Sequence, residues 1–229
     1  MTFAHKIRSP DGEFGVYIAQ PSAPNGAALV VIQEIFGVNG VMRAFADYYA
    51  TLGYVAIVPD LFWRLEPGVS ITDETPTDLA KAFDLYGKFN VDSGIEDIQA
   101  TIDFARTLCP KVGTVGYCLG GLLAYLAACR TNIDASVSFY GVSIDTYITE
   151  AKKIAKPLLL HVASEDKFVS KQAQMAISDM TDSNPAITLQ FYQGLDHAFA
   201  RPGGEHFDAG GAALANARTV TVFEQSLLS

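Results

Sequence analysis

Short apolar segments recur along the chain, and most of them are continuous rather than alternating. Continuous apolar runs are typical of strands buried on both faces of a parallel sheet. They predict strands at residues 27–32, 54–59, 112–117, 135–140 and 157–162. Residues 187–192 alternate between apolar and polar positions, which predicts a strand nearer an edge. Residues 14–18 predict an antiparallel strand at the start of the chain.

Segments with helical patterns follow most of these strands. They cover residues 41–52, 77–89, 94–108, 119–129, 170–180 and 209–228. Strands that alternate with helices imply crossover connections, so we expect an α/β protein with a mostly parallel sheet and helices on both faces. No internal repeat or low-complexity linker is visible, and a single domain over residues 1–229 is expected. In such sheets ligands bind beyond the carboxyl ends of the strands.

The composition argues against some classes of binding partner and indicates the cellular compartment. The net charge of −9 argues against nucleic acid, whose phosphates require basic patches. No apolar run approaches the length of about 18 residues that a membrane span needs. The N-terminus lacks the apolar core of a secretory signal. The three cysteines fit no disulfide or metal-ligand framework, so we expect free thiols and a cytoplasmic location.

Cys118 lies in a candidate nucleophile elbow. Gly116 and Gly120 flank it in the pattern G-x-C-x-G, which is the elbow G-x-S-x-G with sulfur in place of oxygen. An apolar strand precedes the motif and a helical segment follows it, as the elbow requires. The helix N-terminus favours the thiolate. Cys109 and Cys129 lack this setting and are expected to be small buried apolar residues.

Three histidines follow Cys118, and the hydrolase order of nucleophile, acid and histidine selects among them. His161 lies inside an apolar strand and is expected to be a packed core residue. His206 lies in a polar, glycine-rich segment and is expected at the surface. His197 follows the last predicted strand, where the catalytic histidine of this topology belongs. We therefore predict that His197 is the general base.

The orienting acid is expected after the strand at 157–162. Glu165 and Asp166 both occur there, and Asp166 is preferred because it lies directly before the turn into the next helix. Its role would be to fix the imidazole tautomer and stabilise the charged imidazole. Asp196 is a weaker candidate, because neighbours in sequence rarely point at each other.

Five segments together resemble the dienelactone hydrolase family (carboxymethylenebutenolidases) of the α/β-hydrolase superfamily. They are residues 33–39, 59–61, 116–121, 140–142 and 197–201. A lone G-x-C-x-G would be weak evidence, but five segments in order are specific, and the resemblance covers nearly the whole chain. It implies an α/β-hydrolase fold and a cysteine-dependent hydrolase of aromatic catabolism. Such an enzyme cleaves a dienelactone to an oxo-dienoate and needs no metal or organic cofactor.

The resemblance also implies roles for residues outside the triad. Glu34 would contact the cysteine and help to activate it when substrate binds; a carboxylate near a thiol otherwise raises the pKa of the thiol. The backbone N–H groups of Leu119 and Ile35 are expected to form the oxyanion hole. Arg201 matches the arginine that binds the substrate carboxylate, a task suited to its bidentate guanidinium. Phe36 and Phe199 adjoin catalytic segments and are expected to contact substrate.

One position departs from the family pattern. The family prototype has a second carboxylate-binding arginine where this chain has Leu79, with only Lys81 and Lys88 nearby. Lys81 is two residues further along the helix and should face elsewhere. The particular substrate is therefore open.

Two alternatives to a dienelactone hydrolase remain. A general carboxylesterase for neutral esters is favoured by Leu79 and opposed by Arg201. A non-catalytic binding protein on the same fold is opposed by the complete Cys/Asp/His set, although fold alone does not fix function. The expected partner is a small lactone or ester carrying a carboxylate, with no nucleic acid or membrane, and the protein is expected to be a monomer.

Overall fold

The computed structural model describes residues 2–229 and divides into two compact units, which meet in sequence between Val112 and Gly113. None of the helices in this described part of the chain is long and apolar enough to span a membrane.

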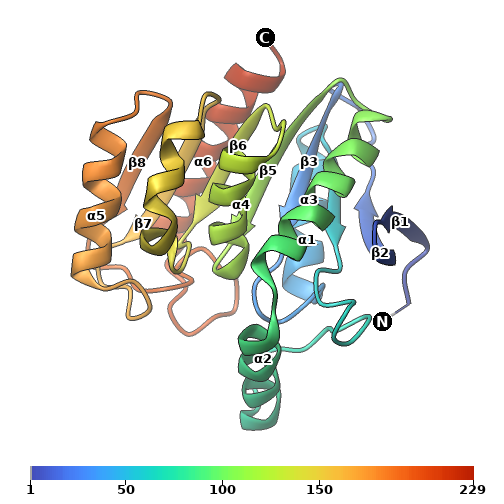
Figure 1. Ribbon diagram of the computed structural model, residues 1–229, viewed down its shortest axis with the longest axis horizontal. Helices are drawn as coiled ribbons and strands as arrows, with labels where there is room; N and C mark the ends of the chain where they lie inside the picture. Colours follow the sequence, from blue (N-terminus) through green and yellow to red (C-terminus); the bar gives the residue numbers. More distant parts are fainter. Residues whose placement is uncertain (1) are drawn as a thin grey trace. The chain divides into compact units, whose positions relative to one another are not determined.

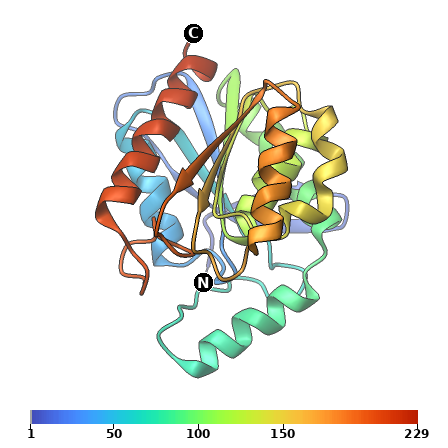
Figure 2. The ribbon, with the colours of Figure 1, turned by 90° about the vertical axis from the view of Figure 1, so that its left-hand side faces the viewer.

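The first unit contains four strands in the order β1-β2-β4-β3. These are β1 (His5–Ser9), β2 (Gly12–Ala19), β3 (Ala27–Ile32) and β4 (Val55–Pro59). β1 and β4 both run antiparallel to β2, whereas β3 and β4 are parallel and are buried along their whole length. Helices α1 (Gly40–Thr51) and α3 (Val91–Arg106) pack on opposite faces of these strands (Figure 1, Figure 2). Helix α2 (Pro76–Lys88) lies apart from the strands of this unit in both views.

The second unit contains four parallel strands in the order β5-β6-β7-β8. These are β5 (Lys111–Tyr117), β6 (Ala135–Phe139), β7 (Leu158–Ala163) and β8 (Ile187–Tyr192). Helices α4 (Leu119–Arg130) and α5 (Lys171–Asp182), with the 3₁₀ helix η1 (Ile144–Lys153), cover one face. Helix α6 (Ala209–Leu227) covers the other face (Figure 2). Because all four strands are parallel, the residues that follow them gather at one edge of this unit.

Most helices begin at a polar residue whose side chain accepts a backbone N–H of the first turn. These residues are Asn39, Thr75, Asn90, Ser170 and Asp208. Helix α4 is different, because its N-cap is Cys118, whose side chain makes no capping hydrogen bond within the described chain. The first N–H groups of α4 are thus left to other acceptors.

The predicted α/β class is confirmed, and each strand and helix expected from the sequence is present within a few residues of its predicted bounds. Strand β2 is antiparallel and β8 is an edge strand, as expected. Two elements were not predicted. Strand β1 contains a single buried apolar residue, Ile7, and exists through its pairing with β2. The 3₁₀ helix η1 buries only Ile144 and Ala151. The single domain expected over residues 1–229 stays a prediction.

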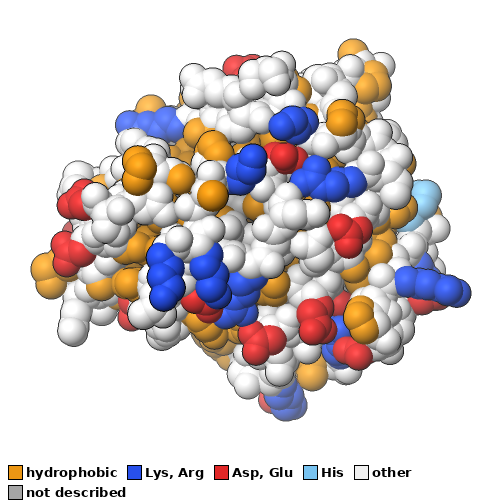
Figure 3. All heavy atoms as spheres, turned by 45° about the horizontal axis from the view of Figure 1, so that its top comes forward, with side chains coloured by type: hydrophobic (Ala, Val, Ile, Leu, Met, Phe, Trp, Pro, Cys, Tyr) orange, Lys and Arg blue, Asp and Glu red, His pale blue; other side chains and the backbone are white. Residues whose placement is uncertain are grey.

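Figure 3 shows one face of the molecule, on which Lys and Arg side chains lie among Asp and Glu side chains and uncharged atoms. Mixed charge of this kind supports solubility and does not by itself identify a partner.

Candidate active site

Cys118 connects β5 to α4 in a sharp turn. Its backbone has φ 56° and ψ −114°, a conformation that is costly for a residue with a side chain. The Cys118 N–H donates to the carbonyl oxygen of Phe139 at 3.1 Å, which fixes the turn against β6. A Cβ on Gly116 would lie 1.8 Å from the backbone oxygen of Gly120, so only glycine fits there. Backbone strain that the surrounding structure maintains is typical of functional sites. In this turn the strained conformation presents the Cys118 thiol at the N-terminus of α4.

Gly116→Ala should lower the free energy of unfolding by more than about 2 kcal/mol, because backbone must move to admit the methyl group. The measurement is urea unfolding followed by near-ultraviolet circular dichroism. Gly87→Ala is the matched control, since a Cβ at this position in α2 meets nothing within 4 Å. The control should be neutral or stabilising, because alanine favours helix over glycine. Equal stability of Gly116→Ala and the native protein would contradict the close approach.

Asp166 and His197 are brought together by the loops that follow β7 and β8. The Nδ1 of His197 lies 2.8 Å from Oδ2 of Asp166, and both side chains are buried. The other carboxylate oxygen, Oδ1, accepts the backbone N–H of Phe168 at 2.8 Å. Asp166 is thus held from both sides, with one oxygen directed at the imidazole.

His197 also hydrogen-bonds to Cys118. Burial alone would lower the pKa of His197, but the electrostatic effect of Cys118 and the hydrogen bonds with Asp166 and Cys118 outweigh burial and raise the pKa to about 10. Because Nδ1 is occupied by Asp166, Nε2 is the nitrogen available to Cys118. The arrangement can move a proton between the thiol and the imidazole.

Two aromatic rings hold the imidazole of His197. The ring centroid of Tyr140 lies 5.1 Å away and that of Phe168 lies 4.8 Å away, both edge-on. Tyr140 has φ 40° and Ala198, directly after His197, has φ 62°. Three of the four non-glycine residues with positive φ in the described chain are therefore in or beside the triad. These two ring contacts limit the rotation of the His197 imidazole.

The sequence pattern does not reveal the contacts of Tyr140 and Phe168 with His197. Tyr140 directly follows β6, and Phe168 lies two residues after Asp166. Their positions after parallel strands were the available signal, but their ring contacts depend on loop geometry that the sequence pattern does not reveal.

Two of the other candidates, His161 and Glu165, have different surroundings. His161 is fully buried in β7, with Nε2 3.0 Å from Oγ1 of Thr219 and Nδ1 2.8 Å from the Tyr192 hydroxyl. Burial, with a smaller contribution from Arg218, lowers the pKa of His161 to about 3, so this imidazole is neutral. Glu165 is exposed and pairs with Lys171. Within residues 2–229, no group of three His, Cys, Asp or Glu side chains is arranged to hold a metal ion.

Arg201 and Phe199 lie in the loop that follows His197. The Arg201 N–H donates to the Ala198 oxygen at 2.9 Å, so the chain turns tightly there. Phe199 has 0% exposure and packs against the rings of Tyr192 and Tyr140. Phe199 therefore supports the ring that contacts His197, and the expected contact with substrate would require side chains to move.

Of the remaining predicted site residues, Leu119 begins α4 in the second unit, and the others belong to the first unit. Glu34, Ile35 and Phe36 directly follow β3, and all three are buried. Leu79 lies on α2. The two nearby lysines are paired with carboxylates: Lys81 with Glu66 at 2.6 Å and Lys88 with Asp84 at 2.6 Å.

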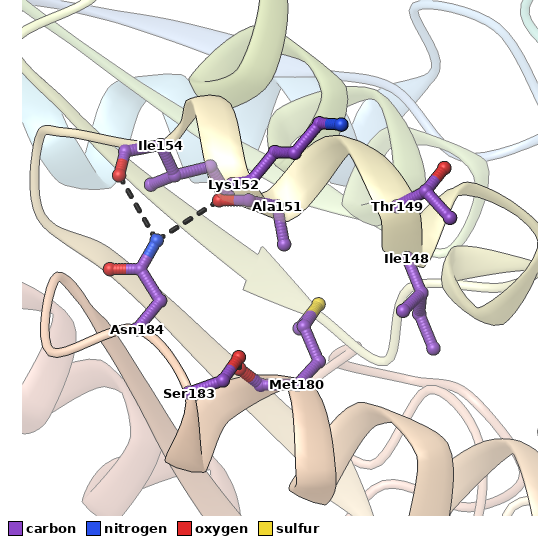
Figure 4. Close-up of a pocket in the computed structure, with 8 residues that line it drawn as sticks. All are labelled: Ile148, Thr149, Ala151, Lys152, Ile154, Met180, Ser183 and Asn184. Carbon is purple, nitrogen blue, oxygen red and sulfur yellow. Dashed lines mark hydrogen bonds between the residues drawn. The ribbon is translucent and has the colours of Figure 1, made fainter.

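A separate pocket of about 520 Å³ lies in the second unit between η1 and the end of α5 (Figure 4). Asn184 fixes its wall by donating to the carbonyl oxygens of Ala151 and Ile154, both at 3.0 Å. Helix α5 begins beside the Asp166 loop and is 12 residues long, or about 18 Å. The pocket is at the far end of this helix and is separate from the triad.

Comparison with known proteins agrees with this geometry. Residues 14–227 match the model of the dienelactone hydrolase family. A protein of Azospirillum brasilense, provisionally named a carboxymethylenebutenolidase, is 44% identical over 220 residues, covering 95% of each chain. The carboxymethylenebutenolidase of Pseudomonas putida is 34% identical over 95% of this chain and 94% of its own. A crystal structure from Klebsiella pneumoniae, provisionally named a dienelactone hydrolase, has the same fold, with a TM-score of 0.83, 22% identity and 96% of each chain covered. This chain therefore belongs to the dienelactone hydrolase family and is a hydrolase of ester bonds, lactones included.

Proposed function

We propose that this protein is a cysteine-dependent lactone hydrolase that opens a dienelactone (carboxymethylenebutenolide) to an oxo-dienoate. The observation that carries the proposal is the continuous hydrogen-bonded set in which Cys118 contacts His197 and His197 contacts Asp166 at 2.8 Å. The carboxymethylenebutenolidase names of its relatives support the choice of substrate class.

In the proposed reaction the Cys118 thiolate attacks the lactone carbonyl and a tetrahedral oxyanion forms. Leu119 is the first residue of α4, so its N–H has no acceptor one turn earlier in the helix and is available to the oxyanion. The carbonyl–oxygen bond of the ring then breaks, leaving a thioester and an enolate, and the enolate takes the proton that His197 received from the Cys118 thiol. The neutral His197 then takes a proton from water, the hydroxide attacks the thioester, and the Cys118 thiolate leaves. Asp166 orients and stabilises the charged imidazole.

Several roles rest on the family resemblance and stay predictions. They are activation of Cys118 by Glu34, a second oxyanion donor at Ile35, and substrate contact by Phe36. The cytoplasmic location and the monomeric state also stay predictions.

A carboxylate-bearing substrate predicts a selective effect of Arg201→Ala. For a dienelactone, kcat/KM should fall at least about tenfold, because charge-assisted hydrogen bonds to the carboxylate are lost. For a neutral aryl ester of similar size, kcat/KM should stay within about twofold, since that substrate has no anion to bind. Steady-state kinetics of both substrates with native and variant protein is the measurement.

Arg8→Ala serves as the control, because the Arg8 side chain is 89% exposed on β1. It should change neither activity. An equal dienelactone kcat/KM in Arg201→Ala and native protein would remove the carboxylate-binding role.

A general carboxylesterase is the second candidate, and Leu79 favours it. A native enzyme that prefers the neutral aryl ester to the dienelactone would select this alternative. A native protein that hydrolyses neither substrate but binds the lactone would support a non-catalytic binding protein.

A further inference from the structure

Asp196 occupies an unusual position between the two loops that carry the catalytic acid and base. Its Oδ1 accepts the backbone N–H of His197 at 2.7 Å and the backbone N–H of Lys167 at 3.2 Å. Its Oδ2 pairs with Nζ of Lys167 at 3.0 Å and lies 3.7 Å from Nε2 of His206. Lys167 directly follows Asp166. One carboxylate thus joins the backbone beside the acid to the backbone of the base.

We propose that Asp196 is a positioning residue, which holds the His197 imidazole at Asp166 through this bridge between their backbones. The proposal rests on the proposed function, in which His197 is the base and Asp166 is the orienting acid. Asp196 bonds to the backbone N–H of His197, whereas the acid that bonds to the imidazole is Asp166.

The bridge completes a set of contacts that continues beyond the ends of β7 and β8. Ser164 N–H donates to the Tyr192 oxygen at 3.0 Å, and Glu165 N–H donates to the Leu195 oxygen at 2.9 Å. Asp196 supplies the next connection along these loops, directly before His197. Beyond it the chain turns sharply at Ala198, where φ is 62°. On its N-terminal side the backbone of His197 is therefore held by these backbone hydrogen bonds together with the Asp196 carboxylate.

The rate of the reaction depends on how precisely His197 is held. A misplacement of about 1 Å in a catalytic group can lower a rate by about 100-fold. Without Asp196, the backbone N–H groups of His197 and Lys167 lose their acceptor, and the His197 loop can move relative to Asp166. Substrate binding involves other residues, so the loss should appear in kcat rather than in KM.

The charge state of Asp196 suits this role. Burial alone would raise the pKa of Asp196, but the hydrogen bonds from the His197 N–H and from the side chain and N–H of Lys167 outweigh burial and lower the pKa. Asn at this position would keep one oxygen as an acceptor for the two N–H groups while losing the charge. Lys167→Met would remove the ion pair while keeping the Lys167 N–H. These two variants distinguish the positioning role of the Asp196 carboxylate from an effect of its charge and ion pair.

The test compares kcat and KM for a dienelactone in native protein, Asp196→Ala, Asp196→Asn and Lys167→Met, at a temperature where circular dichroism shows every variant to be folded. We expect kcat of Asp196→Ala to fall about 10- to 100-fold with KM within about twofold. Asp196→Asn should recover kcat to within about threefold of native, and Lys167→Met should stay within about twofold. A native kcat in Asp196→Ala, or an Asp196→Asn variant as slow as Asp196→Ala, would overturn the proposal.

A second readout does not depend on the substrate. The rate of Cys118 alkylation by iodoacetamide, assigned by mass spectrometry, depends on the His197 imidazole that pairs with the thiolate. It should fall in Asp196→Ala and recover in Asp196→Asn; no change in Asp196→Ala would overturn the positioning role. If native protein does not turn over dienelactone, the proposed function fails, and alkylation still decides the role of Asp196.

Discussion

Cys118→Ala should reduce kcat/KM for lactone hydrolysis at least about 10⁴-fold, because it removes the covalent route and leaves only oxyanion binding and proximity. The fold should survive, since alanine meets the same backbone cost as cysteine at φ 56°. Steady-state kinetics measures the loss, and urea unfolding of the variant verifies that the elbow still folds.

The other two cysteines provide the controls. Burial raises the pKa of Cys129 to about 11 and outweighs the smaller effects of Tyr125 and Arg130, which lower this pKa. The Cys129 thiol therefore stays protonated at neutral pH. Cys109 is also buried, and its pKa is likewise raised by burial. Cys109→Ala and Cys129→Ala should therefore keep activity within about threefold of native, apart from a modest loss of stability. Full activity in Cys118→Ala would exclude it as the nucleophile.

The elements predicted from the sequence were those determined by local pattern. Strand β3 and strand β7 are continuous apolar runs, and both are buried along their length. The G-x-C-x-G spacing predicted a tight strand-to-helix turn, and the close approach of Gly116 to the Gly120 backbone gives the physical reason. The apolar neighbours of His161 correctly indicated a core histidine, which is fully buried and bonded to Thr219.

Features that depend on contacts between distant loops were not predictable. Phe168 is more than half exposed and gives no core signal in the sequence, yet its ring packs on His197. Asp196 was considered only as an alternative acid, because sequence cannot reveal that its carboxylate turns back to backbone N–H groups of two loops. Such contacts depend on the pairing of β7 with β8, which places residues about 30 positions apart side by side.

Asp166→Asn should lower kcat about 10³- to 10⁴-fold, because it reverses the hydrogen bond to the imidazole. The Phe168 N–H donates to Oδ1 at 2.8 Å and needs an acceptor, so the amide oxygen of asparagine takes that position. The amide NH₂ then faces Nδ1 of His197, where Oδ2 lies in the native protein. An NH₂ donor selects the tautomer with the proton on Nε2, which cannot accept a proton from Cys118 or from water. The measurement is kcat across the pH range.

Glu165→Gln is the matched comparison, because Glu165 is the adjacent carboxylate and the other acid that the sequence offers. Its side chain is exposed and pairs with Lys171, and surface pairs of this kind contribute little. This variant should retain kcat within about twofold of native. A large loss in Glu165→Gln together with native activity in Asp166→Asn would transfer the acid role to Glu165. We expect kcat to fall in Asp166→Asn and not in Glu165→Gln, because only the first substitution reverses the 2.8 Å hydrogen bond between Oδ2 of Asp166 and Nδ1 of His197.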